Sequence, residues 1–153
     1  MSAQHGATME RLEWDQSLLI GIEKIDAQHR KLFELANLFF ESLAMTKGPG
    51  LRHPILRRLV AYVRTYFADE EDAMRRMGYP EVDAHIDRHK AMTGHIHELI
   101  RQWDNGQSVD ADALCRFLRQ WLSEHIGIED KKIGTFYNAQ NTSVSAESTP
   151  NTI

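Results

Sequence analysis

The sequence lacks several features that would assign it to a particular class of protein. It has one cysteine, Cys115, among 153 residues, so neither a disulfide within the chain nor a site made of several thiolates can form. No apolar stretch approaches the roughly 18 residues of a membrane-spanning helix, and residues 1–14 contain no apolar signal core. The net charge of −4 gives no basic surface for nucleic acid. We therefore expect a globular cytoplasmic protein with neither a membrane nor a nucleic-acid partner.

The alternation of apolar and polar residues that marks β-strands is also absent. Four segments instead place apolar residues at helical spacing, and glycine, proline and polar residues separate them. We expect these helices to begin near Asp26, Pro54, Glu81 and Asp110, with Asp26 as the N-cap of the first. Four amphipathic helices joined by short loops predict an all-α fold, an antiparallel up-down four-helix bundle.

The length of the chain fits one domain with two flanking segments. We expect the bundle to occupy residues 25–137. Residues 1–24 have few helix signals but carry large apolar side chains, which predicts an extended N-terminal arm packed on the bundle. Residues 138–153 are polar and poor in large apolar groups, which predicts a disordered tail.

The sequence contains eight histidines, and several of them fall on the inner faces of the expected helices together with other polar groups. These inward residues are His29 from the first helix, Tyr66 and Glu70 from the second, His85 and His89 from the third, and His125, followed by Asp130, from the fourth. Lysine and arginine are missing from this set, so metal ions are the natural counter-charge for its buried carboxylates. Imidazole and carboxylate ligands suit iron, manganese or zinc.

Each of these residues has another interpretation when it is taken alone. Glu70 could reach water from the edge of its helix, Asp130 could be a surface or capping residue, and His29 could be a satisfied core histidine. The coincidence of such groups on all four helices, with His85 and His89 one helical turn apart, favours a site for more than one metal ion.

Four ordered motifs resemble those of the hemerythrin family, specifically the bacterial hemerythrins. The motifs are IDAQHRKL at 25–32, YFADEEDAM at 66–74, HIDRH at 85–89 and WLSEHIGIED at 121–130. The resemblance covers roughly residues 12–137 and extends to Trp14 and to the GYP turn at 78–80.

This resemblance implies a centre of two non-haem iron ions that binds O₂. It implies that His85, His89 and His125 hold one iron, that His29 holds the second, and that Glu70 and Asp130 bridge the two together with an oxo or hydroxo group.

Tyr66 departs from the family pattern, which has a histidine at this position as a further ligand of the second iron. Three roles are open for the phenol. It could bind oxidised iron as a phenolate, it could stay protonated and donate a hydrogen bond to a bound oxygen species, or it could turn away and pack as an ordinary aromatic side chain.

The resemblance therefore predicts a protein that binds O₂ or a related small ligand, for oxygen transport, storage or sensing. The alternative is a di-iron oxidase or peroxidase whose chemistry Tyr66 alters. We expect a binding protein rather than an enzyme, with an electron donor as a further partner.

Overall fold

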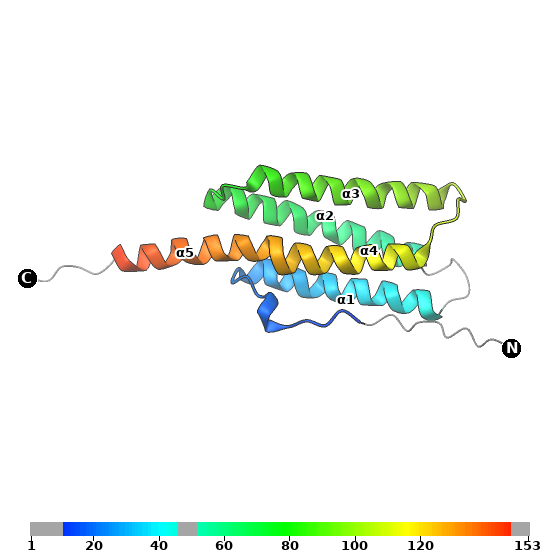
Figure 1. Cartoon of the computed structure of the whole chain (residues 1–153), viewed down its shortest axis with the longest axis horizontal. Helices are drawn as coiled ribbons and strands as arrows, with labels where there is room; N and C mark the ends of the chain where they lie inside the picture. The colour runs from blue at the N-terminus through cyan, green and yellow to red at the C-terminus, as the bar shows by residue number, and fades with distance from the viewer. Residues whose placement is uncertain (1–10, 46–51, 148–153) are drawn as a thin grey trace, which may run out of the picture.

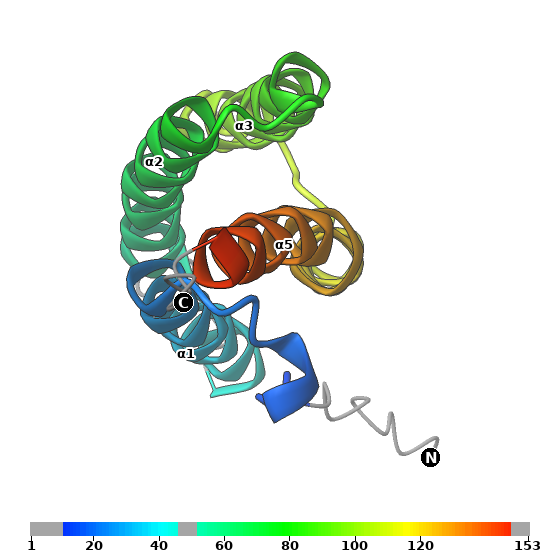
Figure 2. The ribbon, with the colours of Figure 1, turned by 90° about the vertical axis from the view of Figure 1, so that its left-hand side faces the viewer.

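The computed structural model describes residues 11–45 and 52–147 of the chain. Its main helices are α1 (Glu23–Met45), α2 (Arg52–Met77), α3 (Val82–Asp104), α4 (Ala111–Glu124) and α5 (Lys131–Glu147). The helices α1, α2 and α3 run alternately up and down, and a last rod made of α4 and α5 completes the bundle (Figure 1). Viewed from one end, the first three helices form an arc around this rod (Figure 2). The expected all-α four-helix bundle is confirmed. None of the helices in the described ranges is long and apolar enough to cross a membrane.

The start of α1 differs from the expectation. The helix begins at Glu23, so Asp26 lies inside its first turn and is not its N-cap. The Asp26 carboxylate instead reaches back and accepts hydrogen bonds from the backbone N–H groups of Ile20, at 2.8 Å, and Gly21, at 3.1 Å. The side chain therefore fixes the chain that enters the helix, and its negative charge also suits the positive end of the helix dipole.

The other helix boundaries follow the local sequence closely. Gly78 has a φ of +68°, a left-handed conformation that glycine adopts readily, and it ends α2 while Tyr79 N–H donates to the Met74 carbonyl at 2.9 Å. Asp110 caps α4, because its side chain accepts the Ala113 N–H at 3.0 Å. The expected KGPG break at 47–50 falls in the stretch 46–51, outside the described residues.

The last rod, made of α4 and α5, changes its helical pitch beside the buried histidines of α1 and α3. Between α4 and α5 the segment His125–Asp130 is a π-helix, and the three pieces run on as one continuous rod (Figure 1). The α5 helix continues to Glu147, so residues 138–147 are helical where the sequence predicted a disordered tail. Backbone hydrogen bonding continues along this end of α5 although the side chains of residues 138–144 are exposed and have little to pack on. Gln140 Nε2 donates to the Met77 carbonyl at 2.8 Å.

The N-terminal arm packs along α1 and the rod. Leu12 exchanges two hydrogen bonds with the buried Asn37 side chain, at 2.7 and 2.9 Å. Lys131 donates to the Leu19 carbonyl at 2.9 Å. At Gly134 the rod approaches Ile20 so closely that an added Cβ would lie 2.4 Å from the Ile20 oxygen. The described part of the arm, residues 11–22, is therefore held at several points.

Candidate metal centre

The inward-facing polar residues meet in one buried cluster in the middle of the bundle. The structure brings together all seven residues selected from the sequence, and each is at most 3% exposed: His29, Tyr66, Glu70, His85, His89, His125 and Asp130. Each of the four rods of the bundle contributes at least one of them. The carboxylate of Glu70 therefore points into the core, as its place on the apolar stripe of α2 predicted.

The three histidines from α3 and the rod form the first half of the cluster. The Nε2 atoms of His85 and His89 lie 2.6 and 3.1 Å from Glu70 Oε1, and the Nε2 atom of His125 lies 3.5 Å from it. The Nε2 atoms of His89 and His125 are only 3.2 Å apart. Imidazole nitrogens that converge in this way fit a common cation, because each lone pair can then serve as a ligand.

His29 and Tyr66 form the second half. The Nε2 atom of His29 lies 2.9 Å from Asp130 Oδ2 and 3.8 Å from Glu70 Oε2. The hydroxyl of Tyr66 lies 3.1 Å from the same nitrogen and donates a hydrogen bond to Asp130 Oδ2. The third role considered for Tyr66, an aromatic side chain turned away from the site, therefore does not match the structure.

Both carboxylates divide their oxygens between the two halves. Asp130 Oδ1 faces His85 and His125, at 3.2 and 3.1 Å, whereas its Oδ2 faces His29. Glu70 does the same, with Oε1 toward the three histidines and Oε2 toward His29. Within the described part of the chain, neither Glu70 Oε2 nor Asp130 Oδ1 has a hydrogen-bond partner, although both are buried. Buried charged oxygens without a donor are costly, so this donor set fits two metal ions bridged by two carboxylates.

The π-helical segment explains how one short motif supplies both His125 and Asp130. In an α-helix, residues five apart point about 140° away from each other. A π-helix closes its hydrogen bonds five residues apart, so it brings such residues to nearly the same face. The wider turn is therefore what directs both side chains to the site.

The charged groups of the cluster strongly shift one another's pKa values. Burial by itself lowers the pKa of a histidine, but Asp130 and Glu70 outweigh it and raise the pKa of His29 to about 9 and that of His125 to about 10. Burial likewise opposes the charged form of Glu70, yet hydrogen bonds from the histidines bring its pKa well below the ordinary range. Among the described residues, the ion-pair partners of Glu70 and Asp130 are all histidines. Without metal, protons on these rings supply the positive charge that balances the carboxylates.

Burial, followed by the charges of Asp130 and Glu70, raises the pKa of Tyr66 well above its ordinary value of 10. The phenol is therefore protonated in the metal-free cluster, and its proton points at Asp130.

One residue of the site was missed by the sequence analysis. Glu71 accepts a hydrogen bond from Nδ1 of His89 at 2.9 Å, and so fixes the ring with Nε2 toward the cluster. Metal-binding histidines generally need such an acceptor on their second nitrogen. The signal available in the sequence was the second glutamate of the EE pair at 70–71.

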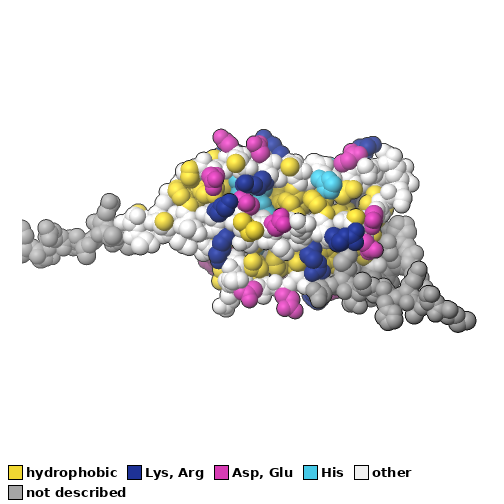
Figure 3. Space-filling model, in the orientation of Figure 1, with side chains coloured by type: hydrophobic (Ala, Val, Ile, Leu, Met, Phe, Trp, Pro, Cys, Tyr) yellow, Lys and Arg dark blue, Asp and Glu magenta, His cyan; other side chains and the backbone are white. Residues whose placement is uncertain are grey.

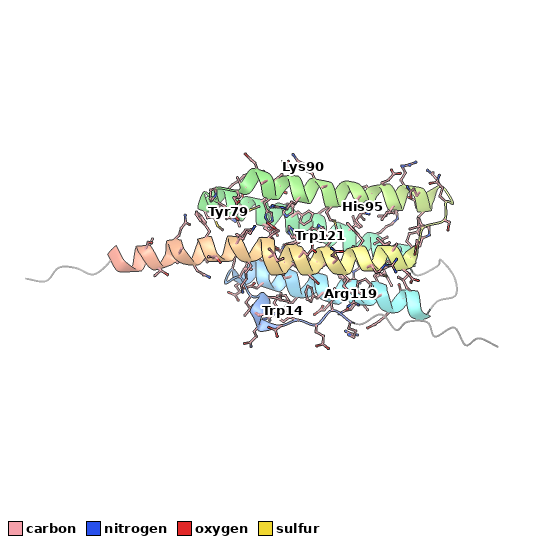
Figure 4. The ribbon with its side chains drawn as sticks, in the orientation of Figure 1. Trp14, Tyr79, Lys90, His95, Arg119 and Trp121 are labelled. Atoms are coloured by element: carbon pink, nitrogen blue, oxygen red, sulfur yellow. The ribbon has the colours of Figure 1, made fainter. Side chains whose placement is uncertain are left out.

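Aromatic rings enclose the cluster on several sides. Phe67 stacks on His89 at 3.7 Å between ring centres, and Trp121 stacks on His125 at 4.4 Å. On the opposite side Trp14, from the arm, approaches His29 at 6.5 Å. Figure 4 shows Trp14, in the arm, and Trp121, in α4, on opposite sides of α1 and the rod.

The sequence and the fold match those of known proteins. Residues 20–137 match the family model described as the hemerythrin HHE cation binding domain. A bacteriohemerythrin of Stenotrophomonas maltophilia is 30% identical over 123 residues, which cover 80% of this chain and 79% of that protein. A bacteriohemerythrin of Methylococcus capsulatus is 31% identical over 117 residues, covering 74% of this chain and 86% of that protein. The crystal structure of a wild-type hemerythrin aligns with a TM-score of 0.76 at 28% identity, covering 82% of this chain and 97% of that one.

Proposed function

The chain belongs to the hemerythrin family, and we propose that the seven residues of the buried cluster hold the di-iron centre that this family binds. The protein is a non-haem di-iron protein that binds O₂. In this proposal His85, His89 and His125 would hold the first iron, His29 and Tyr66 would hold the second, and Glu70 and Asp130 would each contribute to both.

The observation that carries the assignment is the division of the carboxylate oxygens. Asp130 directs one oxygen to His85 and His125 and the other to His29. A single metal ion in the first half would use Oδ1 alone and leave Oδ2 to His29 and Tyr66, whereas two ions use both oxygens. Two irons ligated from facing helices, with carboxylate bridges, are a known use of a bundle core.

When bound, the two irons would supply the redox chemistry that O₂ binding needs. The chain's own part is to hold the ligands in place and to exclude water. Glu71 orients His89, and the π-helical turn orients His125 and Asp130. The stacked rings of Phe67 and Trp121 cover two of the ligand histidines. Water exclusion keeps the charges of the site in a low-dielectric environment and limits side reactions.

For Tyr66 we propose ligation through the phenolate when the second iron is oxidised. The support is geometric, because the hydroxyl oxygen lies 3.1 Å from Nε2 of His29 and within hydrogen-bond distance of Asp130 Oδ2. An adjacent cation lowers the pKa of such a group and can remove its proton. An anionic oxygen donor stabilises ferric over ferrous iron more than a neutral imidazole does. We therefore propose that O₂ binding is less reversible in this protein than it would be with a histidine at position 66.

The family assignment does not favour the oxidase or peroxidase alternative. A cytoplasmic location and an electron donor stay predictions.

The test of the proposal is the metal content of the protein after iron-replete expression. We expect two irons per chain and an O₂ adduct on the chemically reduced protein, visible as a change in its absorption. A content of one metal or none would contradict the assignment of the seven ligands. A matched Glu70→Gln variant should lose iron, because it removes a bridging charge at nearly constant side-chain volume.

A further inference from the structure

Trp121 connects the candidate metal centre to the surface of the protein. Its ring stacks on His125 with an angle of 12° between the planes. It also contacts Phe67 edge-on at 5.5 Å, and Phe67 in turn stacks on His89 with an angle of 6°. Phe67 is buried, whereas Trp121 is partly exposed. Two of the three histidines of the first half are thus linked through ring contacts to one indole that reaches solvent.

A groove of about 390 Å³ lies against this indole, between α3 and the rod formed by α4 and the π-helical segment. Figure 3 shows the face on which hydrophobic side chains and histidine gather between these helices, with charged side chains around them. The groove combines an aromatic, apolar floor of Met92, Phe117 and Trp121 with a polar rim that includes Arg88, His95 and Glu129. Arg88 and Glu129 form an ion pair of 2.9 Å at this rim.

The chemistry of the groove suits a small planar molecule with polar edges. Its volume lies within the range of small-molecule sites, about 300–1,000 Å³. Aromatic rings prefer offset-stacked or edge-on partners. Trp121 can offer such a contact, whereas Phe117 already packs on His95 at 4.4 Å between ring centres. Polar groups on the rim can pair with carbonyl and N–H groups at the edge of a heterocycle.

A buried ferric centre needs a supply of electrons before it can bind O₂, and this need rests on the proposed function. We propose that the groove binds a planar heteroaromatic electron donor of the dihydroflavin type, and that Trp121 is the path by which its electrons reach the centre. The dihydroflavin loses two electrons and two protons and becomes the oxidised flavin. The two electrons would reduce the two ferric ions that the seven residues would hold, one electron each, and the two protons pass to solvent. His125 also lines the groove, and Trp121, stacked on His125, adds a second ring between the donor and the centre and is itself neither oxidised nor reduced overall.

Trp14 provides a matched control, because it is the tryptophan beside the other half of the cluster. Its ring is tilted by 46° relative to His29 at 6.5 Å and does not stack on it. The Arg30 guanidinium lies 5.4 Å from the Trp14 ring centre, so this indole already has a cationic partner. Replacing it should leave the proposed electron path intact.

The experiment follows the anaerobic reduction of the iron-loaded ferric protein by photoreduced riboflavin in a stopped-flow spectrometer. For the wild type we expect the rate to saturate as the riboflavin concentration rises, because the donor must first bind. Ala91→Trp, at an exposed position that lines the groove, should abolish saturation and slow the reaction about tenfold or more. Its reduction by dithionite, a small anion that needs no aromatic floor, should stay within about twofold of the wild-type rate.

Trp121→Leu should lower the limiting rate about tenfold, whereas Trp14→Leu should leave it within about twofold. Both variants are first checked for iron content and O₂ binding. A linear concentration dependence in the wild type, or an unchanged rate in Ala91→Trp, would overturn the groove as the donor site. An unchanged limiting rate in Trp121→Leu would overturn the path. Failure of the proposed function is distinct, because the wild type would then lack iron or fail to bind O₂ when reduced.

Discussion

Tyr66 places an acidic oxygen where the second half of the cluster gathers its ligands. The hydroxyl contacts the nitrogen of His29 and donates to Asp130. A phenolate differs from imidazole in its charge and its hardness. It therefore changes which oxidation state of the bound ion is favoured more than it changes where that ion lies. The expected departure from the family pattern therefore concerns one ligand position.

We predict that the ferric, iron-loaded protein absorbs broadly in the visible, from charge transfer between the Tyr66 phenolate and iron. Tyr66→Phe removes the oxygen and should abolish this band, while His85, His89 and His125 still hold the first iron. Tyr66→His supplies a neutral donor and should make O₂ binding more reversible. The measurements are absorption spectra and cycles of anaerobic reduction, O₂ addition and O₂ removal.

Two results together would show that the phenol is not a ligand. One is an unchanged spectrum in Tyr66→Phe at full iron content, and the other is a wild type that cycles as cleanly as Tyr66→His.

At the scale of single residues, the sequence predicted which side chains face inward. Helical spacing was sufficient for Glu70, because a carboxylate on an apolar stripe has few stable surroundings. Spacing could not identify Glu71, which lies off that stripe and becomes relevant only when His89 is seen to need an acceptor. The roles of the seven residues as ligands stay a prediction until the metal is measured.

At the scale of helices, the arm and the rod depend on each other. Ile20 packs against Gly134, and Asp26 holds the backbone of Ile20 and Gly21. The arm also carries Trp14, which lies beside His29. The contact at Gly134 therefore helps to cover the second half of the cluster.

Gly134→Ala should destabilise the protein by about 1–3 kcal/mol, as expected for a group forced into a packed contact. The added Cβ would lie 2.4 Å from the Ile20 oxygen and 2.7 Å from its Cβ, so the arm must shift. Gly94→Ala, on α3, is the matched control, because a Cβ at this position meets no atom of the described residues within 4 Å. That variant should gain about 0.5–1 kcal/mol from its lower chain entropy in the unfolded state.

Urea unfolding of the iron-loaded proteins gives both values. A Gly134→Ala variant at least as stable as Gly94→Ala would show that the arm is not held by this contact.

Helix number and most helix starts followed from the sequence, but the pitch of the last rod did not. His125 and Asp130 are five residues apart, a spacing that suits neither the 3.6-residue period of an α-helix nor the period of a strand. The packing of the rod against the cluster is what stabilises the wider π-turn. The helical end of α5 was also missed, because its polar composition gives no apolar stripe to read.

At the scale of the whole molecule, the cluster makes stability depend on whether its positive charge comes from protons or from metal ions. The carboxylates of Glu70 and Asp130 are buried in the centre of all four rods. An unpaired buried charge is strongly destabilising. Protons on His29 and His125 balance these charges in the metal-free protein, whereas metal ligation requires the same rings to be neutral.

We predict that the metal-free protein loses stability as the pH rises from about 6.5 to about 10. A group with a raised pKa stabilises the folded state fully below its ordinary pKa, 6.5 for histidine, and this contribution disappears as the pH passes the raised values of about 9 for His29 and about 10 for His125. The lowered pKa of Glu70 acts in the opposite direction, so its contribution is present above its ordinary value of 4.5 and is lost toward acid. The metal-free protein should therefore be most stable between about pH 4.5 and 6.5.

The iron-loaded protein should behave differently, because protons compete with iron for the same nitrogens and destabilise it as the pH falls. Thermal melts of chelator-stripped and iron-loaded samples are measured at pH 5.5, 7.5 and 9.5 (about two pH units apart). The difference in melting temperature between the two samples should widen as the pH rises. A melting temperature of the metal-free protein that stays constant or increases over this range would show that protons on the buried histidines do not balance the carboxylates.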